Sequence, residues 1–185
     1  MTTVADTTAG RTVAALRNLY VARFGFALVW AVLLFLTAPV SQPVSVALLV
    51  IYPLFDVAAA IVDLRTSTTA RPATALYVNL AVSLLTAAGL AVAASSGVPA
   101  ELRVWGVWAI TAGIVQLIVA VGRRGLGGQW AMILSGGIST VAGTAFILQA
   151  GTPAASLTNL AGYAIAGGVF FLISALRLHR TAKSV

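Results

Sequence analysis

The chain has 185 residues, of which 60% are hydrophobic and only 8% are charged, whereas soluble domains carry about 25% charged residues. This small number of charged side chains cannot cover a water-facing surface. The composition therefore excludes a soluble globule and suits a protein solvated by lipid. The net charge of +7 comes from short basic clusters at the ends of apolar runs. Because no basic stripe carries interleaved aromatic residues, we expect no nucleic-acid partner.

Six apolar stretches predict six membrane-spanning helices, because each is near the ~20 residues that cross a hydrocarbon core. In chain order they cover residues 19–38, 44–62, 73–94, 102–121, 130–150 and 157–176. The first stretch is longer than a signal-peptide core and lacks a small-residue cleavage site, so we expect it to stay uncleaved. Short breaks rich in Gly, Pro and Ser separate the stretches, so successive helices should be antiparallel.

The predicted fold class is an all-α membrane protein whose six helices form three antiparallel hairpin repeats. The transmembrane domain covers residues 18–178, after an N-terminal segment of residues 1–17 that we expect to be cytoplasmic and disordered. Residues 179–185 form a cytoplasmic tail. Ten of the eleven Lys and Arg residues fall at one set of helix ends, with only Arg103 at the other. The positive-inside rule therefore predicts that both termini lie in the cytoplasm.

The second, fourth and sixth stretches share an aromatic residue in their outer or middle part and a basic cluster at the end, which indicates three copies of one helix pair. The copies contain residues 51–56, residues 106–118 followed by Arg123 and Arg124, and residues 163–169 followed by Arg177. Together with residues 127–130, 133–138 and Gly143, they resemble the short-repeat membrane protein family that includes the bacterial acid-resistance protein HdeD. The first copy departs most, because it carries Pro53 and has Val57 in place of a glycine.

The resemblance implies a six-helix inner-membrane protein linked to acid or envelope stress, and it implies no particular reaction. Candidate chemistry therefore comes from the residues themselves. Asp56 stands out, because an ionisable group inside a spanning helix costs at least ~2.5 kcal/mol and normally faces a partner or a water-filled cavity. Arg23 lies eighteen residues before the turn at Ser41 and Asp56 fifteen after it, so their depths differ by about 4–5 Å. Arg23 could pair with Asp56, or instead with Asp63 nearer the interface.

The same depth estimate places Asn79 and Gln116 in the cytoplasmic third of the membrane. We therefore predict an intramembrane polar layer formed by Arg23, Asp56, Asn79 and Gln116. Such a layer could line a cavity open to the cytoplasm, or its members could simply form hydrogen bonds between helices, each worth roughly 0.6 kcal/mol.

Other residues have structural interpretations. Arg123 and Arg124 are expected to contact anionic lipid headgroups, and Trp105, Trp108 and Tyr163 are expected near the outer membrane boundary. Small residues at four-residue spacing predict tight helix packing within the chain, or self-association as a second use. Their clearest examples are Ala109 with Gly113, and Ser135 and Ser139 with Gly143.

Enzyme chemistry finds little support in the sequence. The four acids are Asp6, Asp56, Asp63 and Glu101, of which only Asp56 is expected to be buried, and there is no cysteine. Neither a catalytic set nor a metal or cofactor site can be assembled. We predict a non-enzymatic protein that acts in stress tolerance through assembly, as a homo-oligomer or with a partner membrane protein. A small proton-linked or solute channel or transporter that uses the polar layer is the alternative, and a scaffolding subunit is a third possibility.

Overall fold

A computed structural model describes residues 4–66 and 73–183, with side chains over residues 12–66 and 74–178. The described residues form helices and no strand. The helices are α1 (Val4–Thr37), α2 (Gln42–Thr66), α3 (Ala73–Ala93), α4 (Val98–Gly122), α5 (Trp130–Gln149) and α6 (Thr158–Lys183), with short 3₁₀ turns η1 (Ala94–Ser96) and η2 (Arg124–Leu126). Within these described residues, six helices are long and apolar enough to cross a membrane, as the sequence predicts.

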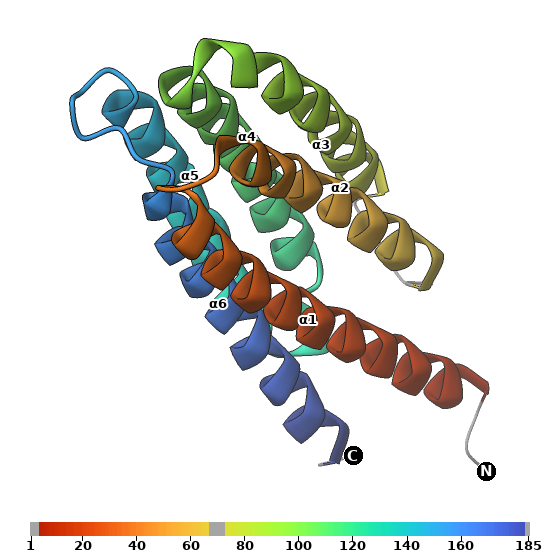
Figure 1. Ribbon diagram of the computed structural model, residues 1–185. Helices are drawn as coiled ribbons and strands as arrows, with labels where there is room; N and C mark the ends of the chain where they lie inside the picture. Colours follow the sequence, from red (N-terminus) through yellow and green to blue (C-terminus); the bar gives the residue numbers. More distant parts are fainter. Residues whose placement is uncertain (1–3, 67–72, 184–185) are drawn as a thin grey trace.

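The six helices surround a common core (Figure 1). Each helix contacts the next in the chain, and α6 returns to contact α1. The first turns of α1 and the last turns of α6 lie at the same end of the bundle, which we call the terminal end; the opposite end is the far end. The most extensive contacts join α4 with α5, α1 with α6 and α2 with α3. The expected hairpins pair α1 with α2, α3 with α4, and α5 with α6, and these pairs have less extensive contacts. The three-hairpin repeat therefore stays a prediction.

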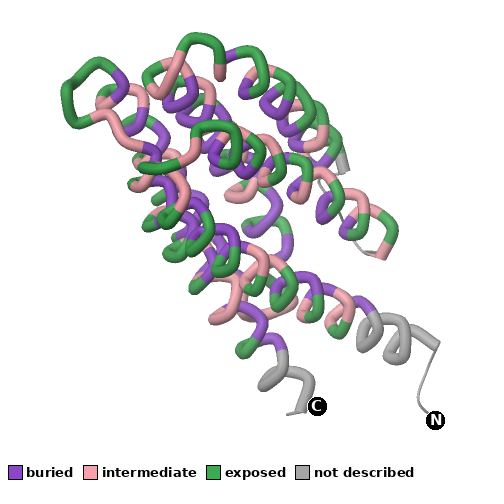
Figure 2. Tube along the Cα trace, viewed as in Figure 1, coloured by how far each residue is buried: buried purple, intermediate pink, exposed green. Residues whose placement is uncertain are grey.

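Apolar side chains lie on both the inside and the outside of the bundle, as lipid permits. Buried residues face the bundle interior along every helix, and exposed residues face outward (Figure 2). Large exposed hydrophobic side chains recur on all six helices. Hydrophobicity alone therefore does not determine which face of a helix points inward, and close packing and polar contacts between helices must do so.

The far half of the bundle is filled by a cluster of aromatic rings. Trp30 stacks on Trp105 with ring centroids 5.3 Å apart, and Tyr52 meets Trp105 edge to face at 5.4 Å. Trp108 also contacts Trp105, at 5.1 Å. The expectation that Trp105 and Trp108 sit as anchors at the membrane boundary is wrong, because both are buried in this cluster.

The N-terminal segment also differs from the prediction. Residues 4–17 were expected to be disordered, but α1 begins at Val4. Leu16 and Tyr20 of α1 pack in a second apolar cluster with Met132, Ala175 and Leu178. Leu16 and Leu178 lie outside the predicted stretches 19–38 and 157–176. At the terminal end, α1 and α6 therefore continue beyond the apolar stretches that predicted them.

Candidate functional site

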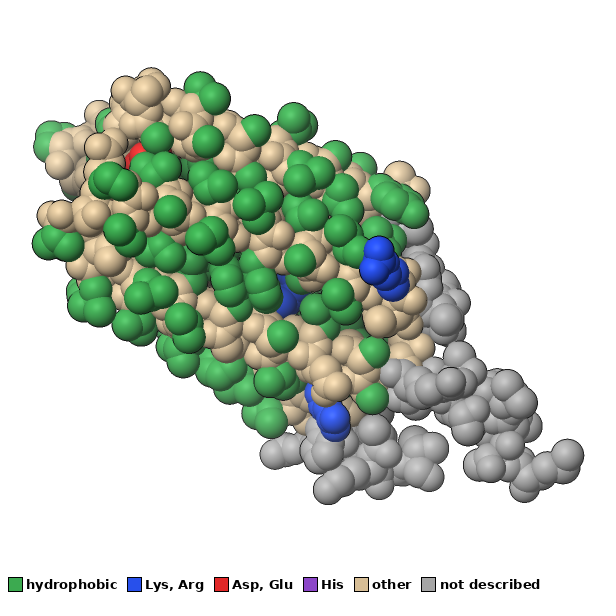
Figure 3. All heavy atoms as spheres, turned by 45° about the vertical axis from the view of Figure 1, so that its right-hand side comes forward, with side chains coloured by type: hydrophobic (Ala, Val, Ile, Leu, Met, Phe, Trp, Pro, Cys, Tyr) green, Lys and Arg blue, Asp and Glu red, His purple; other side chains and the backbone are tan. Residues whose placement is uncertain are grey.

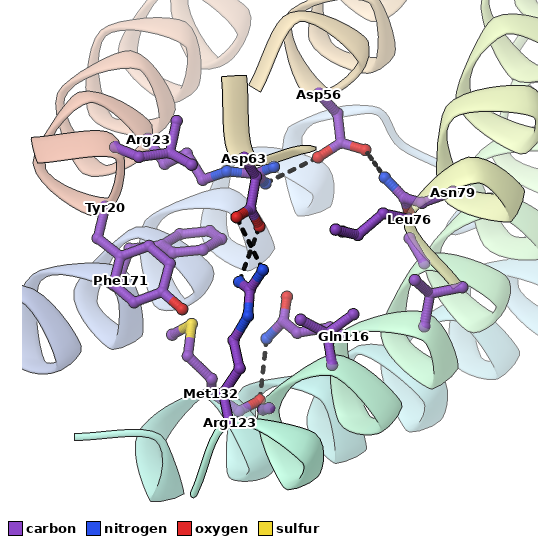
Figure 4. Close-up of a pocket in the computed structure, with 15 residues that line it drawn as sticks. Tyr20, Arg23, Asp56, Asp63, Leu76, Asn79, Gln116, Arg123, Met132 and Phe171 are labelled. Atoms are coloured by element: carbon purple, nitrogen blue, oxygen red, sulfur yellow. Dashed lines mark hydrogen bonds and ion pairs between the residues drawn. The ribbon is translucent and has the colours of Figure 1, made fainter. Parts of the chain in front are cut away.

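Asp56 is held by three side chains from two neighbouring helices. Its Oδ1 accepts a hydrogen bond from Arg23 Nη1 of α1 at 2.7 Å, which forms an ion pair. Its Oδ2 accepts from Asn79 Nδ2 of α3 at 2.5 Å (Figure 4). The same oxygen accepts from Ser83 Oγ, also on α3, at 2.9 Å. Of the two partners proposed for Arg23, the structure thus selects Asp56. Both oxygens of this buried carboxylate are satisfied, as a charge in a bundle interior requires.

The Asp56 network continues into the aromatic cluster through a serine. Ser83 accepts a hydrogen bond from Trp108 Nε1 at 3.0 Å while its own hydroxyl donates to Asp56. Ser83 is completely buried, so neither partner can be replaced by water without a rearrangement. Neither Ser83 nor Trp108 was predicted to be part of the site. Ser83 lies four residues after Asn79, on the same helix face, and this spacing was the available signal.

A second ion pair joins α2 to the end of α4. Arg123 donates two hydrogen bonds to Asp63, from Nη1 to Oδ2 and from Nη2 to Oδ1, each 2.8 Å long. The expected headgroup contact is wrong for Arg123, which is only 5% exposed, because its guanidinium turns inward to the carboxylate. Arg124 is exposed, so its headgroup contact stays a prediction.

The Arg123 guanidinium of this second ion pair keeps its charge although it is buried. Burial by itself lowers the pKa of Arg123, but the hydrogen bonds and negative charge of Asp63, together with smaller contributions from Tyr20, raise that pKa above its ordinary value. The guanidinium therefore stays charged. A bidentate pair of this geometry fixes the two helix ends relative to each other.

The two carboxylates share one face of α2. Asp63 follows Asp56 by seven residues, which is two helical turns or roughly 10 Å along the axis. On α4, Gln116 and Arg123 have the same spacing. Gln116 lies beside the cavity and donates from Nε2 to the carbonyl of Met132 on α5 at 3.0 Å. Seven-residue spacing from the predicted residues could therefore have identified Asp63 and Arg123 as inward-facing.

These side chains surround one cavity of about 80 Å³ in the terminal half of the bundle, room for a few water molecules. All four residues of the predicted polar layer, Arg23, Asp56, Asn79 and Gln116, line it (Figure 4). Apolar residues complete the wall: Leu19, Leu76, Ala112, Val115, Val119, Ala120, Met132 and Phe171. Phe171 also lies under the Arg23 guanidinium, 5.2 Å from it, a cation–π contact that adds to the ion pair.

Tyr20 connects the cavity to the turn between α4 and α5. Its hydroxyl donates to Gln129 Oε1 at 3.3 Å, and Gln129 Nε2 donates to the Gly127 carbonyl at 3.1 Å. Both Tyr20 and Gln129 are buried. Gln129 was not predicted to be part of the site, because a glutamine in a loop gives no sign of burial.

Glu101 is a further correction, because Asp56 was expected to be the only buried acid. Glu101, in the first turn of α4 at the far end, is 1% exposed, and its Oε1 has no hydrogen-bond partner. Asp63 is buried as well.

Among the residues with described side chains, no three His, Cys, Asp or Glu residues lie close enough to hold a metal ion.

The fold and this site define the class: a multi-pass α-helical membrane protein with a small polar cavity in one half of its bundle. Comparisons with known protein families, with characterised proteins and with solved structures found no match. The resemblance to HdeD-like proteins therefore remains a prediction from the sequence.

Proposed function

We propose that this chain is a non-enzymatic, HdeD-like protein of the inner membrane that supports acid or envelope stress tolerance through its polar cavity, and not by conducting a solute. One observation carries the proposal. The cavity with both ion pairs occupies the terminal half, whereas Trp30, Leu34, Leu102 and Trp105 in the far half are almost completely buried. Because a conduction path needs polar groups through the whole bilayer, this division argues against conduction.

The proposed orientation puts the cavity on the cytoplasmic side, with both termini in the cytoplasm. The exposed basic residues Arg65, Arg124 and Arg177 lie toward the terminal end, and Arg103 lies toward the far end, which the positive-inside rule associates with a cytoplasmic terminal end. Because the chain has no cysteine, single cysteines can test this directly. We expect Gly125→Cys to react only after an impermeant thiol reagent gains access to the cytoplasm, and Ser96→Cys to react in intact cells.

Assembly with a second copy or with a partner membrane protein is part of the proposal. Added Cβ atoms at Gly25, Gly162 and Gly167 would meet no other atom within 4 Å. These small residues therefore remain available for close contact with another helix. Anionic lipid headgroups are the further partners that we expect, at Arg124.

Complementation of a strain that lacks the chain tests the stress role. We expect wild-type protein to restore survival of an acid challenge and Asp56→Asn to fail, because Arg23 loses its charged partner. Arg23→Gln should fail as well, whereas Arg103→Gln, the same substitution at an exposed site, should complement. Membrane levels of each variant are measured by immunoblot. Full complementation by Asp56→Asn at wild-type levels would contradict the proposal.

A small proton-linked or solute transporter is the second candidate function. Its specific support is Pro53, which lies one turn before Asp56 inside α2, because interrupted helices beside a charge are typical of transport sites. Near this proline the indole of Trp30 donates to the Leu48 carbonyl at 2.7 Å. A flux of protons or solute into proteoliposomes that disappears in Asp56→Asn would establish this candidate and overturn the first.

A further inference from the structure

A groove on the outside of the bundle runs between α1 and α2 in the terminal half. It has a volume of about 440 Å³ and is lined by Ala15, Asn18, Leu19, Ala22, Phe55, Ala58, Ala59, Val62 and Thr66. Four alanines form much of its walls, so the two helices leave a space that their own side chains do not fill. The groove is separate from the polar cavity, with which it shares only Leu19.

The length of the groove matches one leaflet of a bilayer. From Phe55 to Thr66 it follows eleven residues of α2, or roughly 16 Å at 1.5 Å per residue, about half of the ~30 Å hydrocarbon core. Its inner end is closed by Phe55, whose ring stacks on Phe26 with centroids 3.8 Å apart. A lipid acyl chain that enters the groove from the terminal end therefore stops near the middle of the membrane.

Only the terminal end of the groove is polar, and its charge is positive. Asn18 and Thr66 lie there, and Arg17 donates to Asn18 Oδ1 at 3.4 Å. Arg65 is exposed and lies seven residues after Ala58 on almost the same helix face. Every acidic side chain that the structure describes is buried, so the described surface around this end carries no exposed carboxylate.

The space-filling view is consistent with this division. In Figure 3, hydrophobic side chains are spread over the face shown, and basic side chains stand toward one end of it. One further basic side chain is visible at the bottom of a hollow between hydrophobic ones. A lipid-exposed face with basic residues at one end complements an anionic headgroup attached to an acyl chain.

We propose that the α1–α2 groove binds one acyl chain of an anionic phospholipid from the leaflet at the terminal end, with its headgroup at Arg65 and Arg17. The proposal does not depend on the function of the polar cavity. It has one consequence for that cavity. Leu19 lines both spaces, so an acyl chain in the groove packs against the outer side of the cavity wall and supports the position of α1.

A second groove offers a matched control. It lies between α4 and α5, with a volume of about 680 Å³, and is lined by Leu117, Ile133, Leu134, Gly137, Ile138, Val141 and Ala142. It is apolar throughout and has no basic residue in its lining. An added Cβ at Gly137 meets no atom within 4 Å, so a side chain introduced there starts in open space beside this groove.

The test uses native mass spectrometry of the full chain released from nanodiscs that contain equal amounts of phosphatidylglycerol and phosphatidylcholine. We expect wild type to retain one lipid with a preference for phosphatidylglycerol. Arg65→Gln should reduce that preference about fivefold, as expected for one basic residue near the headgroup. Ala58→Phe, at an exposed alanine of the groove, should abolish retention of both lipids, and Gly137→Phe should leave both unchanged.

Three outcomes would overturn the proposal. One is equal retention of the two lipids by wild type, and another is undiminished retention by Ala58→Phe. The third is a wild-type dimer that Ala58→Phe dissociates, which would show that a second copy occupies the groove. Ala22→Phe on the facing helix repeats the measurement from the other wall, so a folding defect in either variant leaves a valid test.

Discussion

Gly106 of α4 and Gly143 of α5 face each other at a contact that has no room for a methyl group. A Cβ built on Gly106 would lie 2.6 Å from the Gly143 carbonyl oxygen, and one built on Gly143 would lie 2.5 Å from the Gly106 oxygen. Two turns away, Gly113 and Gly136 form an equivalent pair, with both distances 2.7 Å. This glycine contact explains why α4 and α5 form the most extensive helix pair, since backbones approach closely only where side chains are absent.

Gly143→Ala should therefore destabilise the protein by about 1–3 kcal/mol, the usual effect of inserting a methyl group into a packed core. Thermal unfolding in detergent, followed by circular dichroism, measures the change. Gly137→Ala on the same helix is the control, because its Cβ enters open space. Equal stability of the two variants would contradict the close contact.

Arg123→Gln should reduce stability by about 3–5 kcal/mol, because it leaves the buried carboxylate of Asp63 without its partner. Arg124→Gln changes the neighbouring exposed arginine and should have almost no effect. The double variant Arg123→Gln with Asp63→Asn should recover part of the loss, since no unpaired charge then remains buried. Denaturant unfolding of the four proteins provides the comparison, and similar losses for Arg123→Gln and Arg124→Gln would show that Arg123 is not buried.

Ser83→Ala should destabilise the bundle by about 1–3 kcal/mol, because it leaves the indole N–H of Trp108 buried without an acceptor. Asp56 also loses one of its three donors. Ser95→Ala is the matched control, because the exposed Ser95 hydroxyl bonds only to the Val92 carbonyl of the preceding turn. Tryptophan fluorescence should report the change at Trp108 in the first variant alone; an unchanged spectrum and midpoint would contradict the link between Ser83 and Trp108.

Two tryptophans of the aromatic cluster should respond differently to the same substitution. Trp30→Phe removes the hydrogen bond to the Leu48 carbonyl, which should add about 1 kcal/mol of destabilisation to the loss of ring volume. Trp105→Phe loses ring volume only, since the buried Trp105 Nε1 has no partner. Unfolding midpoints compare the two, and a larger loss for Trp105→Phe would be the contrary result.

Part of the site was predictable from the sequence because depth in a membrane follows from residue counting. Arg23, Asp56, Asn79 and Gln116 were placed at one level by their distances from the turns, and the structure arranges all four around one cavity. Asp63, Arg123 and Glu101 were missed or misassigned, because a residue near a helix end can point either to the interface or to the core. Counting residues gives height, and it does not give rotation about the helix axis.

The sequence by itself determined that the chain has six helices long and apolar enough to span a membrane, because hydrophobicity and length are properties of each segment alone. It also determined that Asp56 needs a partner, since an unpaired charge inside such a helix is costly. Only the tertiary structure decided that the partner is Arg23, that Arg123 turns inward to Asp63, and that Trp105 fills the core. The reason is that lipid accepts an apolar face on either side of a helix, so close contacts such as Gly106 with Gly143 set which face points inward.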